Sequence, residues 1–147
     1  EQPHYSVLDR TVEREIVPVC EKYGIGIIPW CPLDGGWLTG KYRRGVPPPP
    51  DSRAIEEKWD LESPESLQRF DVLERLEALA QKRGKTLSQF ALAWLLANKA
   101  VTAPIIGPRT FQQLDDNMDA LGWTIGREEL ATVDELVAPG STTSAAA

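Results

Sequence analysis

Two stretches of this 147-residue chain contain residue types that could bind a phosphate-bearing ligand. The first runs from Trp30 to Tyr42 and combines an aromatic ring, small residues and a lysine. A flat ring at a strand end can stack on a planar ligand, exposed backbone N–H groups can wrap a pyrophosphate, and Lys41 can meet a phosphate. Alternatively, Trp30 fills the core, the glycines form turns and Lys41 is a solvated charge. Spacing alone favours that alternative, because glycine-rich loops are an unspecific signal.

The second stretch, residues 106–117, leads from an apolar run directly into a capped helix. Free backbone N–H groups and the positive end of the helix dipole make such a helix start a ready anion site. Arg109 lies one residue before the expected N-cap and could form a forked contact with a phosphate. Gln113, Asp116 and Asn117 share one helical face, where they could contact the edge of an adenine. Taken singly, each is explained slightly better as a cap or as part of a solvated face.

Composition narrows the class of partner and the compartment. The net charge is -6 and the pI about 4.8, which argues against a nucleic acid partner, because phosphate binding requires clustered Lys and Arg. Cys20 and Cys31 lack a metal-binding spacing and His4 is the only histidine, so no zinc site is expected. No apolar run approaches the ~20 residues of a membrane helix. No signal peptide is visible, and the reducing cytoplasm is the default compartment.

Short apolar runs alternate with amphipathic segments, which indicates parallel β–α units. Strands are expected at 2–8, 25–30 and 101–106, and helices at 11–23, 66–83, 86–98, 110–121 and 127–137. Gly24 should end the first helix, in which Pro18 should cause a kink or a late start. The irregular stretch 31–65, with four consecutive prolines, is expected to be functional or mobile. Residues 141–147 are predicted to be a disordered tail.

The helix patterns also predict which residues form the core. The helix at 66–83 is amphipathic, whereas the helix at 86–98 is apolar nearly all round and should be deeply buried. Residues 86–89 and 110–113 both have the capping-box pattern. The first helix should bury one row of residues at helical spacing, namely Val12, Ile16, Val19 and Cys20.

In combination these motifs resemble the aldo-keto reductase superfamily, and within it the branch of potassium-channel β-subunits and general-stress reductases. Five patterns occur in the family's order and cover nearly the whole chain. They are Gln-Pro-x-Tyr (2–5), Gly-Ile-Gly-Ile-Ile-Pro-Trp (24–30), Pro-Leu-x-x-Gly-x-Leu-Thr-Gly-Lys-Tyr (32–42), Ala-Leu-x-Trp (91–94) and Gly-Pro-Arg-Thr-x-x-Gln-Leu-x-x-Asn (107–117). The resemblance implies an α/β fold: the C-terminal part of a (β/α)8 TIM barrel, about three βα units plus a C-terminal helix, over residues 1–140.

The resemblance also implies NADP(H) as the cofactor, lying across the carboxyl ends of the strands. Gln2 would contact the nicotinamide carboxamide, and Trp30 would stack on the nicotinamide ring. Cys31 replaces the family's usual serine and so loses a strong hydroxyl donor. The remaining contacts would follow the cofactor from its pyrophosphate to its adenosine: Cys31, Pro32, Leu33, Asp34 and Gly35 along the pyrophosphate, Lys41 at a phosphate, Gly107 and Arg109 at the 2′-phosphate, and Gln113, Asp116 and Asn117 at the adenosine.

The family's catalytic set is an Asp, a Tyr, a Lys and usually a His, and it does not map onto this chain. The Tyr belongs to an Asp-x-x-x-Tyr pattern, but no Asp stands four positions before Tyr5, Tyr23 or Tyr42. His4 lies in the wrong segment and is interpreted as an ordinary polar residue. Without a positioned acid, a carbonyl oxygen cannot be protonated as hydride arrives. The chain alone is therefore expected not to reduce carbonyl substrates.

Three functions stay open at this point. Joined to an N-terminal half, the chain would take part in hydride transfer between NADPH and an aldehyde or ketone. As a non-catalytic module it would hold nucleotide or regulate a partner, and as a remnant it would have no activity. A three-stranded piece of barrel has two raw edges and an uncovered inner face, so self-association or pairing with an N-terminal half is expected. The first residue is not Met, which indicates a chain cut from a longer one or processed.

Overall fold

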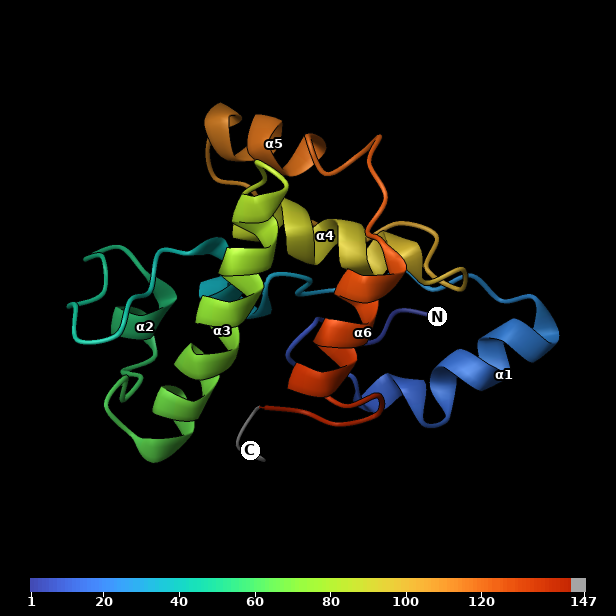
Figure 1. Ribbon diagram of the computed structural model, residues 1–147, viewed down its shortest axis with the longest axis horizontal. Helices are drawn as coiled ribbons and strands as arrows, with labels where there is room; N and C mark the ends of the chain where they lie inside the picture. Colours follow the sequence, from blue (N-terminus) through green and yellow to red (C-terminus); the bar gives the residue numbers. More distant parts are fainter. Residues whose placement is uncertain (144–147) are drawn as a thin grey trace.

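The computed structural model describes residues 1–143, in which several helices pack around three short, paired backbone segments. Figure 1 shows α3 and α6 side by side with α4 crossing them, and both α4 and α6 contact α3. The helical elements are, in chain order, η1 (Thr11–Glu13), α1 (Ile16–Tyr23), η2 (Asp34–Thr39), α2 (Arg53–Glu56), α3 (Pro64–Lys82), α4 (Leu87–Ala97), α5 (Phe111–Met118) and α6 (Arg127–Leu136).

The three paired segments run parallel, with the one that ends at Trp30 in the middle. Parallel bridges join His4 to Trp30 and Ile27 to Val101, and a third joins Trp30 to Ile105. On one side the N–H of Trp30 donates to the carbonyl of Pro3 at 3.0 Å, and on the other the N–H of Ile105 donates to Pro29 at 2.8 Å. This arrangement confirms the predicted alternation of parallel segments with helices.

The pairing within residues 1–143 consists of single bridges rather than the continuous strands that the sequence predicts. The N–H of Thr102 donates to the carbonyl of Ile27 at 2.7 Å, but the next donor to the central segment is Ile105. Residue 104 is a proline and has no N–H, and Pro29 likewise has no donor to offer its neighbour. Prolines inside a sheet remove ladder hydrogen bonds, which explains why the predicted strands are interrupted.

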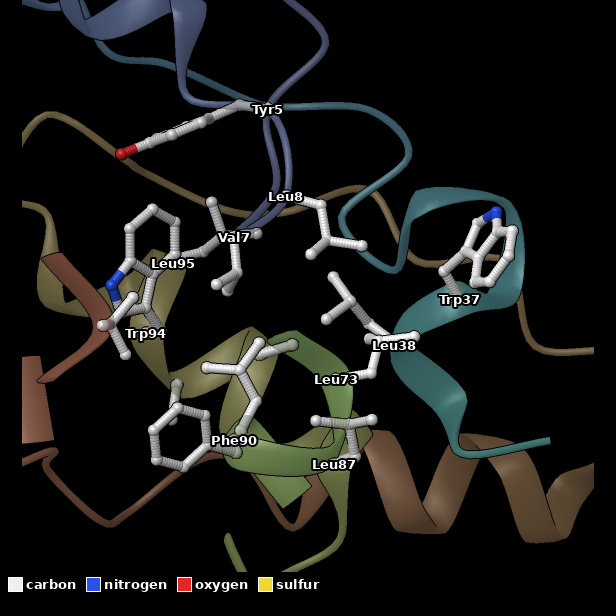
Figure 2. Packing of buried hydrophobic residues seen from close by; sticks show 14 of the residues in the cluster. Tyr5, Val7, Leu8, Trp37, Leu38, Leu73, Leu87, Phe90, Trp94 and Leu95 are labelled. Atoms are coloured by element: carbon white, nitrogen blue, oxygen red, sulfur yellow. The ribbon is translucent and has the colours of Figure 1, made fainter. Parts of the chain in front are cut away.

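The core lies between the paired segments and the helices, as Figure 2 shows. Phe90 and Leu95 of α4 are fully buried and pack near Val7, Leu8 and Leu73 in this view. From Leu87 to Leu95 every residue of α4 is buried, which confirms the prediction from its apolar surface. The predicted capping box is also present: the Thr86 hydroxyl accepts from the Gln89 N–H, and the Gln89 amide accepts from the Thr86 N–H.

The first helix differs from its prediction. A short 3-10 turn precedes the α-helix, which starts at Ile16, because Pro18 has no N–H and fits best in a first turn. The restart rotates the buried face, so that Val17 is buried while Val19 is 49% exposed. The assignment of Val19 to the core is therefore wrong. Gly24 ends the helix with φ 65°, as predicted.

The C-terminal residues that are described are paired with the start of the chain. The N–H of Arg10 donates to the carbonyl of Ser141 at 2.8 Å, and the N–H of Thr143 donates to Leu8 at 2.8 Å. An antiparallel bridge joins Asp9 to Thr142. The predicted disordered tail is therefore wrong for 141–143, and the rest of it, 144–147, lies outside the described residues.

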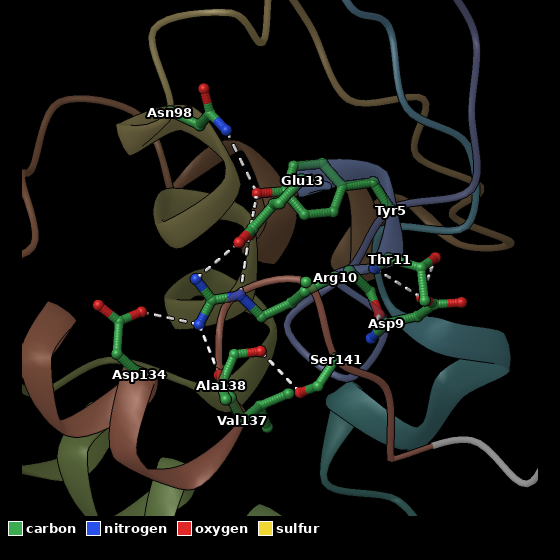
Figure 3. Close-up of polar contacts among 12 residues, drawn as sticks. Tyr5, Asp9, Arg10, Thr11, Glu13, Asn98, Asp134, Val137, Ala138 and Ser141 are labelled. Carbon is green, nitrogen blue, oxygen red and sulfur yellow. Dashed lines mark hydrogen bonds and ion pairs between the residues drawn. The ribbon is translucent and has the colours of Figure 1, made fainter. Parts of the chain in front are cut away.

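A buried arginine ties the C-terminal helix to the N-terminal segment (Figure 3). Arg10 donates to Glu13, to Asp134 of α6 at 2.7 Å and to the carbonyl of Val137 at 2.6 Å. The hydroxyl of Tyr5 donates to the same Glu13 at 2.7 Å. Since Arg10 is almost fully buried, this network fixes α6 against the start of the chain. Within residues 1–143, no helix combines the length and apolar character that crossing a membrane requires.

Candidate functional site

The two stretches singled out in the sequence leave the paired segments at the same end. Trp30 is the last paired residue of the central segment, and it is bridged to Ile105 of the neighbouring segment. Because the segments are parallel, the chain that follows Trp30 and the chain that follows Ile105 start from one edge. Ligands of α/β folds bind at this carboxyl edge. The Trp30 side chain is half-exposed there, so one ring face is available for stacking.

Within residues 1–143, the face of the paired segments that carries Trp30 is open to solvent. Ile28 is 40% exposed, whereas Ile27 next to it is fully buried. Successive side chains of an extended segment point to opposite faces, so Ile28 and Trp30 share the uncovered one. Gln2 is exposed and His4 is bridged to Trp30, so these two project from the same face of the adjacent segment. Gln2 thus lies on the face where the resemblance requires it.

A tight turn follows Trp30. Cys31 has φ 55° and Gly36 has φ 103°, both in the left-handed region. The N–H of Gly35 donates to the Cys31 sulfur at 3.1 Å, which closes the turn. A Cβ on Gly36 would come within 2.5 Å of the Lys41 side chain. The glycine therefore lets Lys41 lie directly against the turn, where its ammonium group also lies 5.0 Å from the Tyr42 ring centroid.

Pro32, Leu33 and Asp34 fit the predicted pyrophosphate path less well. Pro32 is buried and, as a proline, has no N–H to donate to a phosphate. The Leu33 side chain packs against the core, and its carbonyl accepts from the N–H of Gly36. The Asp34 carboxylate points to protein cations, at 3.6 Å from His4 and 3.6 Å from Arg69. Of this set, Cys31 and Gly35 are partly exposed and carry no side-chain ion pair, although the N–H of Gly35 already donates to the Cys31 sulfur.

The turn rests on an aromatic cluster in the long stretch expected to be irregular. Trp37 is buried and stacks on Trp59 with ring centroids 5.4 Å apart and an angle of 8° between the planes. Tyr42 and Phe70 contact the same ring edge-on. The stretch 31–65 also contains η2 and α2. It is therefore built around its own core, and the expectation of an irregular stretch is wrong for these parts.

The second stretch forms a capped helix start with one exposed cation. The Thr110 hydroxyl accepts from the Gln113 N–H at 3.2 Å, and the Gln113 side chain accepts from the N–H of Arg109 at 2.7 Å. In a capping box the Gln113 side chain would accept from the N–H of Thr110, but here it accepts from the N–H of Arg109, one residue upstream. The Arg109 side chain is exposed and donates to the carbonyl of Asp51 at 3.2 Å. A Cβ on Gly107 would meet no atom within 4 Å, so the backbone there is open to a ligand.

Asp116 and Asn117 are held by the protein. The Asp116 carboxylate accepts from the Thr86 hydroxyl at 3.1 Å and from the Gln89 amide at 3.0 Å, which joins α5 to the start of α4. Asn117 is buried. Gln113 is exposed, although its carbonyl oxygen already serves the cap. Arg109 and Gly107 are therefore the residues of this stretch that are most open to a ligand.

A charged cluster that the sequence interpretation missed surrounds His4. Its Nδ1 lies 3.1 Å from an Asp9 carboxylate oxygen, and its Nε2 lies 3.6 Å from Asp34. The hydrogen bond with Cys31, the hydrogen bond with Asp9 and the negative charge of Asp34 together outweigh the opposing effect of burial and raise the pKa of His4 to about 9. The signal in the sequence was the position of His4, two residues after Gln2 in a segment that ends beside Trp30.

Two neighbours of His4 have perturbed pKa values as well. Burial raises the pKa of Asp34, although Arg69 and His4 act against it. Burial lowers the pKa of Arg69, whose guanidinium carbon lies 4.7 Å from the Trp37 ring centroid. Perturbed ionisable groups at a carboxyl edge are typical of functional sites. Among residues 1–143, no group of three or more His, Cys, Asp or Glu is arranged to hold a metal ion.

A separate cavity of about 320 Å³ opens between α1, α4 and α6. It is lined by the network around Arg10, including Tyr5, Glu13 and Asp134, together with Trp94. These residues already satisfy one another, and the cavity borders neither of the two stretches. The candidate site is therefore the carboxyl edge with Trp30, the turn that follows it, Lys41 and Arg109.

The chain is similar to curated proteins along nearly its whole length. Over 144 residues the chain is 37% identical to the uncharacterized oxidoreductase YrpG of Bacillus subtilis, covering 97% of this chain and 42% of that protein. It is 37% identical to the L-glyceraldehyde 3-phosphate reductase of Escherichia coli O157:H7, covering 95% and 41%. It is 32% identical to a putative voltage-gated potassium channel subunit beta of Schizosaccharomyces pombe, covering 93% and 41%.

A solved structure has the same fold. The glycerol dehydrogenase of Gluconobacter oxydans superposes with a TM-score of 0.79 at 30% identity, over 92% of this chain and 41% of that one. The chain thus spans less than half the length of the relatives it matches. The model of the aldo/keto reductase family matches residues 1–138. This chain belongs to the aldo/keto reductase family.

Proposed function

We propose that this chain is the cofactor-binding part of an NADP(H)-dependent aldo/keto reductase that transfers hydride between NADPH and an aldehyde or ketone. The observation that carries the proposal is the common edge: the half-exposed Trp30 and the exposed Arg109 follow parallel segments bridged to each other. Reductase and dehydrogenase names among the relatives fit this chemistry. About three βα units and a C-terminal helix, over residues 1–140, would then complete a barrel together with an N-terminal half.

The residues at this edge fit the chemical groups of NADPH from one end to the other. Trp30 offers a ring face for the nicotinamide, and Gln2 on the same face offers an amide for its carboxamide. The left-handed turn at Cys31 and Gly35 lies beside the cationic side chain of Lys41, which suits a pyrophosphate. Arg109 presents a fork of donors for the 2′-phosphate, and Gly107 leaves room for the adenosine.

The cofactor supplies the hydride when bound, and the described residues hold and orient it. Stacking on Trp30 fixes which face of the nicotinamide is turned toward the open side of the edge. The charges of Lys41 and Arg109 offset those of the phosphates. Because no Asp-x-x-x-Tyr pattern occurs in the chain, we propose that it does not reduce carbonyl compounds by itself and that a complementary half supplies the acid.

A non-catalytic regulatory role is the second candidate. It is favoured by the potassium channel subunit among the relatives together with the unmatched catalytic pattern. Both candidates require cofactor binding, but only the first requires turnover after a complementary N-terminal half is added. Two free cysteines fit a reducing compartment such as the cytoplasm for either one.

The proposal is tested by titrating the chain with NADPH and NADH while following nucleotide fluorescence. We expect saturable binding of NADPH, lost in Trp30→Ala. We expect Arg109→Ala to weaken NADPH binding by about tenfold, or ~1.4 kcal/mol, without affecting NADH, which lacks the 2′-phosphate. Arg75→Ala is the matched control, because Arg75 is an exposed arginine on α3.

Three results would contradict the proposal or a part of it. The cofactor site would be rejected if NADPH produced no saturable signal at millimolar concentration, or if Arg109→Ala and Arg75→Ala behaved alike. Aldehyde-dependent oxidation of NADPH by the purified chain would show that it needs no complementary half. A complementary half that restored turnover would favour the reductase over the regulatory role.

A further inference from the structure

His4 is in direct contact with the ring that the proposed function assigns to the nicotinamide. The centroids of the His4 and Trp30 rings are 4.7 Å apart, with 53° between the planes. The backbones of the two residues are bridged in parallel register, so their side chains leave the same face side by side. The Trp30 side chain is still half-exposed, so His4 covers only part of the indole. The His4 imidazole thus packs against the Trp30 indole.

Two carboxylates from different parts of the chain fix the imidazole in turn. Asp9 holds Nδ1 at 3.1 Å, and its other oxygen accepts from the N–H and the hydroxyl of Thr11 at 3.1 and 2.7 Å. Asp34 lies 3.6 Å from Nε2, and its second oxygen faces Arg69. Neither carboxylate can swing away without losing these other partners. The orientation of the His4 ring is therefore set from both of its nitrogens.

We propose that His4 is a positioning residue that fixes the tilt of the Trp30 indole and thereby sets how tightly the nicotinamide end of the cofactor is held. The inference rests on the proposed function for the identity of the ligand. The contact between the His4 and Trp30 rings is present without a ligand, so the coupling between the two residues does not depend on the proposed function. His4 touches no reacting atom in this account, and it acts only through Trp30.

The charge on His4 makes this positioning dependent on pH. The groups that face the ring are Asp9, Asp34 and the Cys31 thiol, with Arg69 behind Asp34. They raise the pKa of His4 to about 9, the hydrogen bond with Cys31 having the largest effect. Deprotonation above that pH removes the attraction of the ring to both carboxylates. Trp30 should then become less restrained as pH rises through about 9.

The first experiment needs no ligand. His4 is the only histidine, so its ring protons can be followed in an NMR titration without ambiguity. We expect the His4 signals to titrate near pH 9 and the Trp30 indole N–H to shift with the same midpoint. In His4→Gln the shift of the Trp30 signal with that midpoint should disappear, whereas it should persist in the control Glu135→Gln, on the exposed side of α6. A Trp30 signal that ignores His4 would overturn the proposal.

The second experiment separates the two ends of the cofactor. Reduced nicotinamide mononucleotide probes the end at Trp30, and 2′,5′-ADP probes the end at Arg109. We expect His4→Gln to weaken NADPH and the mononucleotide by about three- to tenfold, the range of one aromatic contact, and to leave 2′,5′-ADP unchanged. The conservative variant His4→Phe, which keeps a ring, should restore part of the loss.

The outcomes distinguish this inference from the proposed function. Equal weakening of all three ligands, or of none, in His4→Gln would overturn the positioning role while the cofactor site stands. A wild-type chain that binds none of the three would overturn the proposed function and the cofactor part of this inference together. The ligand-free NMR result would then still confirm or overturn the coupling of His4 to Trp30.

Discussion

Successive residues of the central segment point to opposite faces of the paired segments, and the two faces differ sharply in how deeply their side chains are buried. Ile27 is fully buried against the helices, whereas Ile28 is 40% exposed and Trp30 is 47% exposed on the opposite face. The packed face receives α4, which is buried along nearly its whole length. On the open face, the His4 ring packs against Trp30.

This difference in burial indicates that the packed face stabilises the fold and that the open face is available for binding. Burial of apolar surface is the main source of folding free energy, so the packed face should determine whether the chain folds. An exposed ring at a carboxyl edge contributes little to that free energy and is available to a ligand. Substitutions on the packed face should therefore act on unfolding, and substitutions on the open face should act on binding and association.

The largest effect is expected from Phe90→Ala on the packed face. Phe90 is fully buried in the core, so its truncation leaves a cavity and should lower the free energy of unfolding by about 3–5 kcal/mol. Chemical denaturation followed by far-UV circular dichroism measures the change. A loss below about 1 kcal/mol would mean that α4 is not packed as described.

A smaller effect is expected where α4 meets α5. The Thr86 hydroxyl caps α4 and also donates to Asp116. Thr86→Ala removes both contacts and should cost about 1–2 kcal/mol, in the range of helix caps. Thr132→Ala on α6 is the matched control and should change little, because the Thr132 hydroxyl only donates to the Glu128 carbonyl of its own helix. If the two variants unfold at the same denaturant concentration, the cap is not contributing.

The His4 cluster predicts a pH-dependent stability. The pKa of His4 is about 9 in the folded chain and 6.5 as the ordinary value. A raised pKa gives stability that is fully present below about pH 6.5 and is lost as pH rises to about 9. Because the group is only partly buried, we expect a loss of about 1 kcal/mol after allowance for screening by solvent. His4→Gln should flatten this part of the denaturation profile, and an unchanged profile would contradict the ion pairs.

The smallest effect on stability is expected from Ile28→Ser on the open face. Its side chain is 40% exposed, so the free energy of unfolding should change by less than about 0.5 kcal/mol. We propose that the chain self-associates through this face, and Ile28→Ser should then weaken the association, which sedimentation velocity can measure against the wild type. A large loss of stability with unchanged association would reverse the proposed roles of the two faces.

Local signals in the sequence were reliable where one segment determines its own structure. The capping residues at Thr86 and the glycine at Gly24 lie where the sequence predicts them, because caps depend on a few neighbouring residues. The predicted strands were interrupted because proline removes donors that only a partner segment reveals. The buried face of the first helix was wrong because the restart at Ile16 rotates it.

The candidate site was predicted less completely than the fold. The common edge of the two stretches follows from parallel segments, which the alternation of elements indicates. The position of His4 near Gln2 was the one signal for the cluster around it, but its partners were missed, because Cys31 and Asp34 are distant in sequence and come close only through the turn after Trp30. The hydrogen bonds that Asp116 accepts from Thr86 and Gln89 were likewise not predicted, because they depend on how α5 packs against α4.

One measurement tests most directly whether the stretches after Trp30 and after Ile105 bind a single dinucleotide. Backbone amide shifts of the chain should be followed by NMR as NADPH is added. If both stretches bind the same molecule, amides of residues 31–41 and of residues 107–117 should shift along curves with one dissociation constant. Curves with two different constants, or shifts confined to one stretch, would contradict it.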